Sequence, residues 1–135
     1  MLGKMLILDH RSSWSRFAAE TLSARGYDPL RVEHQEEALA LLEKAAREGE
    51  EYSLIIVDPL NGRIEDPGIK PMEVAGTIAK LFPQLPLIVA SSRPTPDEAV
   101  LAYEIGASNY IPKTCDESQL MESVEKIIHR AHSHS

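Results

Sequence analysis

Two aspartates, a serine and a lysine stand out in the sequence because each follows a short apolar run. Asp9 follows KMLIL, Asp58 follows SLIIV, Ser91 follows PLIVA and Lys113 follows NYIP. A carboxylate can act as a nucleophile that forms an acyl phosphate, while a lysine and a hydroxyl can neutralise and hold the phosphoryl oxygens. These residue types therefore predict phosphoryl chemistry, provided that the fold brings them together.

The apolar runs are the segments that must position these residues. We expect five strands, at residues 4–8, 29–33, 53–57, 86–90 and 109–112. The first, third and fourth runs are continuously apolar, which is typical of central strands covered on both faces. The second run alternates and suits an outer strand, and Pro112 places the fifth at a sheet edge or a strand end.

Stretches of helical periodicity separate the runs. We expect helices around residues 14–22, 38–45, 72–81, 96–105 and 120–128, with glycines at 26, 49 and 106 following three of them. Alternating strands and helices joined by right-handed crossovers predict an α/β fold, a doubly wound, five-stranded parallel sheet of the flavodoxin-like three-layer (βα)5 type. In such a sheet, ligands bind outside the carboxyl ends of the strands, where the four residues would converge.

Composition limits the possible functions. The 135 residues, 43% of them apolar, predict one domain with a core at about residues 4–130 and a polar tail at 131–135. A net charge of −7 argues against direct nucleic-acid binding. Cys115 is the only cysteine and has no internal disulfide partner, and the apolar N-terminus is too short for a signal peptide or a membrane span. We therefore expect a cytoplasmic protein with no membrane contact.

The segments LILDH, LIIVDP, LPLIVASS and GASNYIPKT resemble the receiver domains of response regulators, over about residues 4–130. The resemblance implies a signalling protein rather than an enzyme. Asp58 would accept a phosphoryl group from a histidine kinase or phosphotransfer protein, and Ser91 and Lys113 would contact that group. Ser91 and Tyr110 would act as the switch that changes the surface of the fourth helix, fifth strand and fifth helix.

The resemblance also implies a Mg²⁺ site. Its ligands would be Asp9, Asp58, the residue at position 10 and the backbone carbonyl of Leu60. That residue is His10, where the family has a second acid, and imidazole is a poor ligand for magnesium. We therefore expect weakened or altered metal binding. A one-residue shift, with Asp9 as the direct ligand, stays open.

Two further departures from the family lie near the site. The segment from Pro59 to Pro71 is longer than usual, and its Glu65 and Asp66 are candidate replacement oxygen ligands. Thr114 stands where a proline commonly follows the lysine, so the peptide bond between them is expected to lose its usual cis preference.

The leading interpretation is a receiver without an attached effector domain, whose output is contact with a downstream protein and possible homodimerisation through the fourth and fifth helices. The alternative is a pseudo-receiver, an interaction module that works without phosphorylation, for which His10 is the best indication. A small-molecule binder of the same topology is disfavoured, since the loop DHRSSWS has no glycine to wrap a phosphate.

Overall fold

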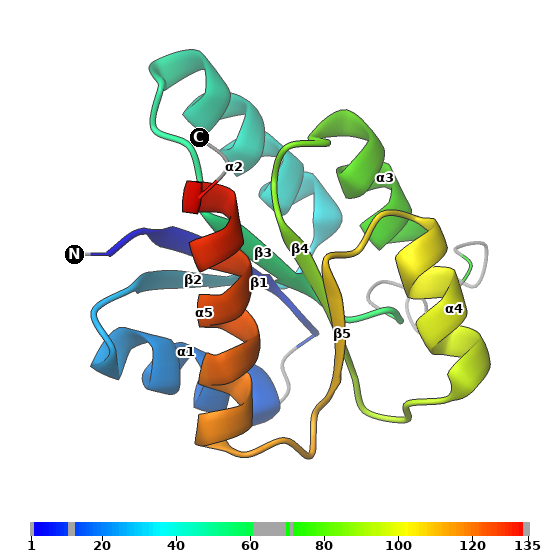
Figure 1. Cartoon of the computed structure of the whole chain (residues 1–135). Helices are drawn as coiled ribbons and strands as arrows, with labels where there is room; N and C mark the ends of the chain where they lie inside the picture. Colours follow the sequence, from blue (N-terminus) through cyan, green and yellow to red (C-terminus); the bar gives the residue numbers. More distant parts are fainter. Residues whose placement is uncertain (1, 11–12, 61–69, 71, 134–135) are drawn as a thin grey trace.

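The computed structural model describes residues 2–10, 13–60, 70 and 72–133. The strands are β1 (Lys4–Leu8), β2 (Asp28–Val32), β3 (Leu54–Val57), β4 (Leu87–Ser91) and β5 (Asn109–Pro112). The helices are α1 (Ser13–Ala24), α2 (Gln35–Glu48), α3 (Glu73–Leu81), α4 (Pro96–Glu104) and α5 (Glu117–Ser133). Strands and helices alternate among these elements, as predicted (Figure 1). No helix in the described part of the chain has the length and apolarity needed to span a bilayer.

The strands form one parallel sheet in the order β2-β1-β3-β4-β5. The chain passes from β1 outward to β2, returns to β3 on the other side of β1, and continues to β5. The winding direction therefore reverses between β1 and β3, which confirms the doubly wound, flavodoxin-like fold. The alternating second run and the run ending at Pro112 are the two edge strands, also as predicted.

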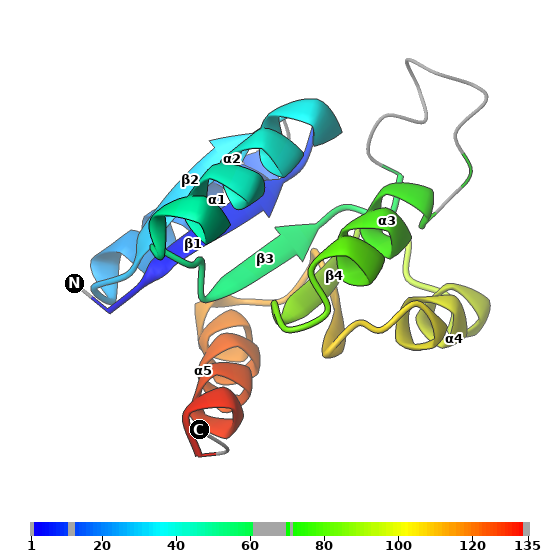
Figure 2. The same ribbon diagram turned by 90° about the horizontal axis from the view of Figure 1, so that it is seen from above.

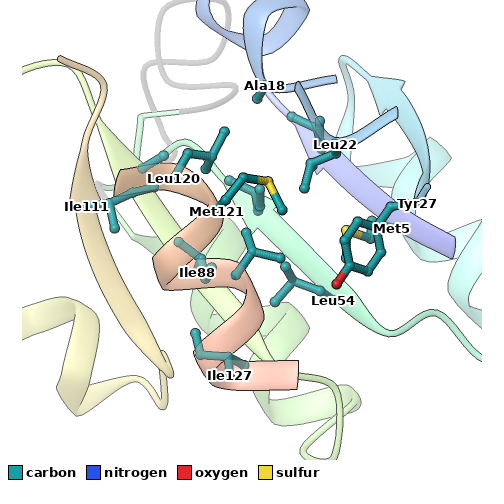
Figure 3. Packing of buried hydrophobic residues seen from close by; sticks show 14 of the residues in the cluster. Met5, Ala18, Leu22, Tyr27, Leu54, Ile88, Ile111, Leu120, Met121 and Ile127 are labelled. Carbon is teal, nitrogen blue, oxygen red and sulfur yellow. The ribbon is translucent and has the colours of Figure 1, made fainter. Parts of the chain in front are cut away.

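Two apolar layers cover the sheet. Helices α1 and α5 pack on one face (Figure 3), whereas α2, α3 and α4 pack on the other. The view from above places α5 and α3 on opposite sides of the sheet (Figure 2). Strands β1, β3 and β4 supply residues to both layers, which explains why their sequences are apolar without alternation.

Several predicted boundaries move by one residue: the second strand is Asp28–Val32 rather than 29–33, the third begins at Leu54, the fourth is Leu87–Ser91 rather than 86–90, and the fourth helix ends at Glu104. Two such shifts, at the third helix and at the fourth strand, concern the surroundings of the site. The third helix was expected to include Met72, but it begins at Glu73. Met72 precedes it in a left-handed conformation with φ 70°, and its N–H donates to the carbonyl of Pro59 at 2.8 Å. Ser91 was expected after the fourth strand, but it is the last residue of β4, because it pairs with Pro112 of β5. The buried Met72 side chain offsets the strain of an uncommon backbone conformation.

Candidate functional site

Two carboxylates and one ammonium group meet at the carboxyl edge of the sheet. Lys113 Nζ donates to Asp9 Oδ2 at 3.0 Å and to Asp58 Oδ2 at 2.5 Å. The side chains of Lys113, Asp9 and Asp58 are 9%, 4% and 14% exposed. Charge-assisted hydrogen bonds are stronger than neutral ones, and low exposure strengthens them further. The three predicted residues therefore form one tightly paired cluster, called here the acid–lysine cluster.

Strand register explains why the two acids are neighbours. Leu8 of β1 pairs with Val57 of β3, and each is followed directly by an aspartate, Asp9 and Asp58. The Asp58 N–H extends the ladder by donating to the carbonyl of Leu8 at 3.0 Å. The acids thus follow two neighbouring central strands, β1 and β3, on either side of the point where the winding reverses.

The two carboxylate oxygens of Asp58 have different partners. Oδ1 accepts the Leu60 N–H at 2.7 Å, which forms the turn that leaves β3, while Oδ2 accepts from Lys113. The turn therefore fixes the orientation of the carboxylate that faces the ammonium group. Asp58 therefore has two roles: it forms the turn after β3, and it belongs to the acid–lysine cluster.

Ser91 lies at the end of β4, beside the strand that carries Lys113. The Lys113 N–H donates to the Ser91 carbonyl at 2.7 Å. The Ser91 side chain is buried, and its Oγ accepts the Arg93 N–H at 3.2 Å. The backbone ladder between β4 and β5 therefore places the hydroxyl-bearing residue and the lysine at the same edge of the sheet.

The cluster carries two negative charges against one positive charge, so its charge is suited to a cation. Mg²⁺ prefers oxygen ligands, keeps several waters and commonly takes only one or two carboxylates. Within the described residues, no group of three or more His, Cys, Asp or Glu side chains converges. Asp9 and Asp58 therefore fit a water-rich magnesium site rather than a cage made only of side chains.

The remaining predicted magnesium ligands differ in their position relative to the cluster. His10 is exposed at the end of β1 and does not join Asp9 and Asp58 in a three-ligand group. Leu60 stays near the cluster through its N–H bond to Asp58, while Glu65 and Asp66 lie outside the described residues. No cis peptide bond occurs in the described chain, so the bond before Thr114 is trans.

Tyr110, in β5, contacts the start of α4. Its hydroxyl donates to Glu98 Oε1 at 2.6 Å and accepts the Thr95 N–H at 3.3 Å. Burial and the hydrogen bond to Glu98 raise the pKa of Tyr110, against opposing hydrogen bonds from Ser91 and Thr95. The sequence analysis identified Tyr110 but missed Thr95 and Glu98, although the TPDE segment is a helix-capping signal.

Trp14 joins the cluster to the core. Its side chain is buried in the layer of α1 and α5, and Lys113 Nζ lies 5.6 Å from the indole centroid. This distance allows a cation–π contact. The indole also borders a shallow groove of about 690 Å³ between the starts of α1 and α5. Among the described residues, its Nε1 has no hydrogen-bond partner.

Comparison with protein families decides what this arrangement belongs to. The family model described as the response regulator receiver domain matches residues 5–125. The chain belongs to this family. Receiver domains are signalling modules of two-component systems that interact with histidine kinases or phosphotransfer proteins and with downstream effectors, and they generally bind Mg²⁺ in the phosphorylation pocket.

Relatives of this receiver domain differ in length. It is 26% identical to the response regulator protein FleR of Pseudomonas aeruginosa over 126 residues, which is 93% of this chain but 24% of FleR. It is 27% identical to a chemotaxis protein CheY homologue of Campylobacter jejuni over 128 residues, covering 93% and 92% of the two chains. A CheY-like receiver structure from Methanospirillum hungatei superposes with a TM-score of 0.82 at 21% identity, with 100% of each chain covered.

Proposed function

We propose that Asp58 accepts a phosphoryl group from a histidine kinase or phosphotransfer protein. The observation that carries the proposal is the contact of the Asp58 carboxylate with Lys113, next to Asp9, at the edge of the sheet where ligands of this fold bind. The family and the geometry of this receiver domain, at about residues 4–130, support the same residue.

The proposed step transfers phosphorus from nitrogen to oxygen. A carboxylate oxygen of Asp58 attacks the phosphorus of the donor phosphohistidine, the O–P bond forms, and the P–N bond breaks with its electron pair left on the imidazole. Lys113 neutralises charge on the phosphoryl oxygens, and Ser91 is the hydroxyl that contacts them. A magnesium ion bound at Asp9, Asp58 and the Leu60 carbonyl would supply further positive charge to the phosphoryl oxygens.

The direct test is intact-mass spectrometry after incubation with acetyl phosphate, with and without magnesium. The wild type is expected to gain one phosphoryl group in a magnesium-dependent way, and Asp58→Asn is expected to gain none. Asp28→Asn is the matched control, because Asp28 is an exposed acid at the amino end of β2, away from the carboxyl edge of the sheet. This substitution should leave the adduct unchanged. An adduct that persists in Asp58→Asn would refute the assignment.

His10 is proposed to weaken magnesium binding, since it replaces a hard oxygen ligand and removes one negative charge. His10→Asp is therefore expected to bind magnesium more tightly, by roughly tenfold. Trp14, the only tryptophan, lies close enough to Lys113 for its fluorescence to report the titration. Equal affinities of the two proteins would remove His10 as the cause of weak binding.

The alternative is a pseudo-receiver that contacts its partner without phosphorylation. The observation that favours it is the exposed His10, which leaves two carboxylates as the only acidic ligands among the described residues that meet at the cluster. A wild-type protein that gains no phosphoryl group with any divalent metal, while its circular dichroism shows an intact fold, would favour this function.

The proposed output surface consists of α4, β5 and α5. On α4, the side chains of Val100, Leu101 and Tyr103 are exposed, which supports contact with a downstream protein or a second copy of the chain. We also propose a cytoplasmic location, with no direct contact with nucleic acid or membrane, in keeping with the net charge of −7.

A further inference from the structure

The ammonium group of Lys113 has an aromatic neighbour as well as its two carboxylates. Its Nζ donates to Asp9 and Asp58, and it lies 5.6 Å from the centroid of the Trp14 indole. The side chain of Lys113 is 9% exposed. A cation close to the face of an indole is attracted by the ring, and the attraction grows when water is excluded. Lys113 is therefore held by two charged groups and by one uncharged ring.

A second lysine–aromatic contact in the described part of the chain shows what burial changes. Lys4 Nζ lies 4.9 Å from the centroid of the Tyr52 ring and 3.6 Å from Glu50 Oε2. The side chain of Lys4 is 37% exposed, so water competes for its ammonium group. Although its ring is nearer, this contact is expected to be weaker than the contact of Lys113.

The burial of the Trp14 N–H indicates that the ring is present for its face. Among the described residues, Nε1 has no hydrogen-bond partner, although Trp14 is only 8% exposed. Burying an N–H group without a partner is unfavourable, and a phenylalanine or a leucine has no such group to bury. A tryptophan at this position is explained by the attraction of its ring for the ammonium group, since indole is the aromatic side chain that attracts a cation most strongly.

We propose that Trp14 is a positioning residue for Lys113. The indole keeps the ammonium group at the carboxyl edge of the sheet when Asp9 and Asp58 hold a magnesium ion. The role of Lys113 at the phosphoryl group rests on the proposed function, whereas the contact between the indole and the ammonium group can be tested without phosphorylation.

The need for such a contact follows from the charges of the acid–lysine cluster. When Asp9 and Asp58 hold a magnesium ion, less of their negative charge is left for Lys113, and the two cations repel each other. Lysine has a flexible stem, so its ammonium group can turn away into the groove that Lys113 and Trp14 both line. The indole attracts the ammonium group but offers magnesium no oxygen ligand. The contact therefore persists when the carboxylates are taken by the metal ion.

The contact is tested first in the wild type, by nuclear Overhauser measurements between the indole protons of Trp14 and the ε-methylene protons of Lys113. The cross-peak is expected without metal and should persist at saturating magnesium, with the amide shifts of Asp9 and Asp58 as the measure of metal binding. A cross-peak that is absent without metal, or lost as magnesium binds, would overturn the proposal. If the two amides do not respond to magnesium, the proposal also fails, because no metal ion then competes for the carboxylates.

The consequence for phosphorylation is tested with two substitutions of Trp14. Trp14→Leu removes the ring, and the rate of Asp58 phosphorylation by acetyl phosphate at saturating magnesium is expected to fall about fivefold. Trp14→Phe keeps a ring that attracts the cation less strongly, and it should lose less than about twofold. The half-saturating concentration of magnesium should not rise in either variant, since neither substitution removes a ligand.

Two control variants separate this role from packing. Leu22→Ala weakens the same apolar layer about two helical turns away from Trp14. Tyr52→Leu removes the ring from the exposed contact with Lys4. Neither is expected to slow phosphorylation by more than about twofold, at a temperature at which circular dichroism shows each protein to be folded.

The outcomes of the two experiments are distinguishable. A rate in Trp14→Leu equal to that in Trp14→Phe or in Leu22→Ala would overturn the proposal, because the ring would then have no role beyond packing. If the wild type gains no phosphoryl group with any divalent metal, the proposed function fails, and the cross-peak with magnesium still decides whether the indole holds the ammonium group. That measurement uses the wild type alone, so it also decides if Trp14→Leu does not fold.

Discussion

Helices α1 and α4 start after the carboxyl ends of two strands of the same sheet, β1 and β4, but they are attached to it very differently. Helix α1 buries Trp14, Ser15, Ala18, Thr21 and Leu22. Helix α4 buries only Ala102, while its Val100 and Tyr103 are 57% and 52% exposed. The difference indicates that α1 is held by the core, whereas α4 depends on the hydrogen bonds at its N-terminus. Movement after phosphorylation is therefore expected at α4.

The lysine of the acid–lysine cluster contacts the firmly attached helix, α1. Trp14 of α1 lies under the Lys113 ammonium group and packs in the same apolar layer as Leu22 (Figure 3 shows Leu22 among its neighbours). Lys113, which binds both carboxylates, therefore packs against α1. The hydrogen bonds of Tyr110 to Thr95 and Glu98 lie at the start of α4, a helix with few apolar contacts to oppose a local opening.

The largest effect should come from removing a core leucine of α1. Leu22 is fully buried, so Leu22→Ala is expected to lower the free energy of unfolding by about 3 kcal/mol. Leu101 of α4 is 37% exposed, and Leu101→Ala should cost less than about 1 kcal/mol. Urea denaturation of both variants measures the comparison. Equal losses would show that α4 is attached as firmly as α1.

The next effect concerns the charges of the cluster. Lys113→Met leaves Asp9 and Asp58 side by side without a counterion, which should lower the free energy of unfolding by about 2 kcal/mol, less once magnesium is added. Asp58→Asn leaves Lys113 paired with Asp9 and should cost under about 1 kcal/mol. Denaturation with and without magnesium measures both. A larger loss in Asp58→Asn would mean that the ion pair to Asp58, and not charge balance, stabilises the pocket.

Most of the fold could be predicted because its signals are local. The continuous apolar runs of β1, β3 and β4 require cover on both faces, and this requirement alone excludes an open antiparallel sheet. Met72 shows where such reasoning stops. Its left-handed backbone is stabilised by burial and by the bond to Pro59, and neither contact is visible in the helical periodicity of the segment.

The site could be predicted in part, because strand ends fix which residues share an edge. The meeting of Asp9, Asp58 and Lys113 follows from the topology. The bridge from Tyr110 to Thr95 and Glu98 does not, since it depends on the rotamer of one side chain and on the distance between β5 and α4. The TPDE segment predicts a capping box, but no sequence rule predicts a third residue within it.

A smaller effect separates the caps of two helices. Thr95→Ala removes the oxygen that accepts the Glu98 N–H at the start of α4 and should cost about 1 kcal/mol, mostly as faster amide exchange within α4. Asp116→Ala removes the oxygen that accepts the Gln119 N–H at 2.8 Å before α5, whose Leu120 and Val124 are buried. Its cost of about 1 kcal/mol should appear in global unfolding.

Amide exchange and urea denaturation of the same two proteins distinguish local from global losses. If Thr95→Ala lowers the midpoint of global unfolding as much as Asp116→Ala does, α4 unfolds together with the core. The proposed difference in attachment between α1 and α4 would then be wrong.

The smallest effect lies in the titration of two tyrosines, one on each side of the molecule. Burial and the charge of Glu125 raise the pKa of Tyr27 in the α1 layer, while burial and the hydrogen bond to Glu98 raise the pKa of Tyr110. Because the unfolded phenols lose their protons first, near pH 10.0, stability present below that pH should be lost as pH rises toward the folded pKa values.

Absorbance titration of tyrosinate in Tyr27→Phe and Tyr110→Phe assigns each transition, with the remaining tyrosines as the common background. Glu98→Gln should lower the pKa of Tyr110, because a neutral amide no longer opposes the phenolate as the carboxylate does, and should leave Tyr27 unchanged. Glu125→Gln should lower the pKa of Tyr27 by less, since Glu125 acts on Tyr27 through its charge alone, whereas Glu98 acts on Tyr110 through both a hydrogen bond and its charge. A pKa of Tyr110 that is unaffected by Glu98→Gln would mean that the hydrogen bond between the Tyr110 hydroxyl and Glu98 is not populated in solution. Helix α4 would then lack the charge-assisted hydrogen bond that links its first turn to β5.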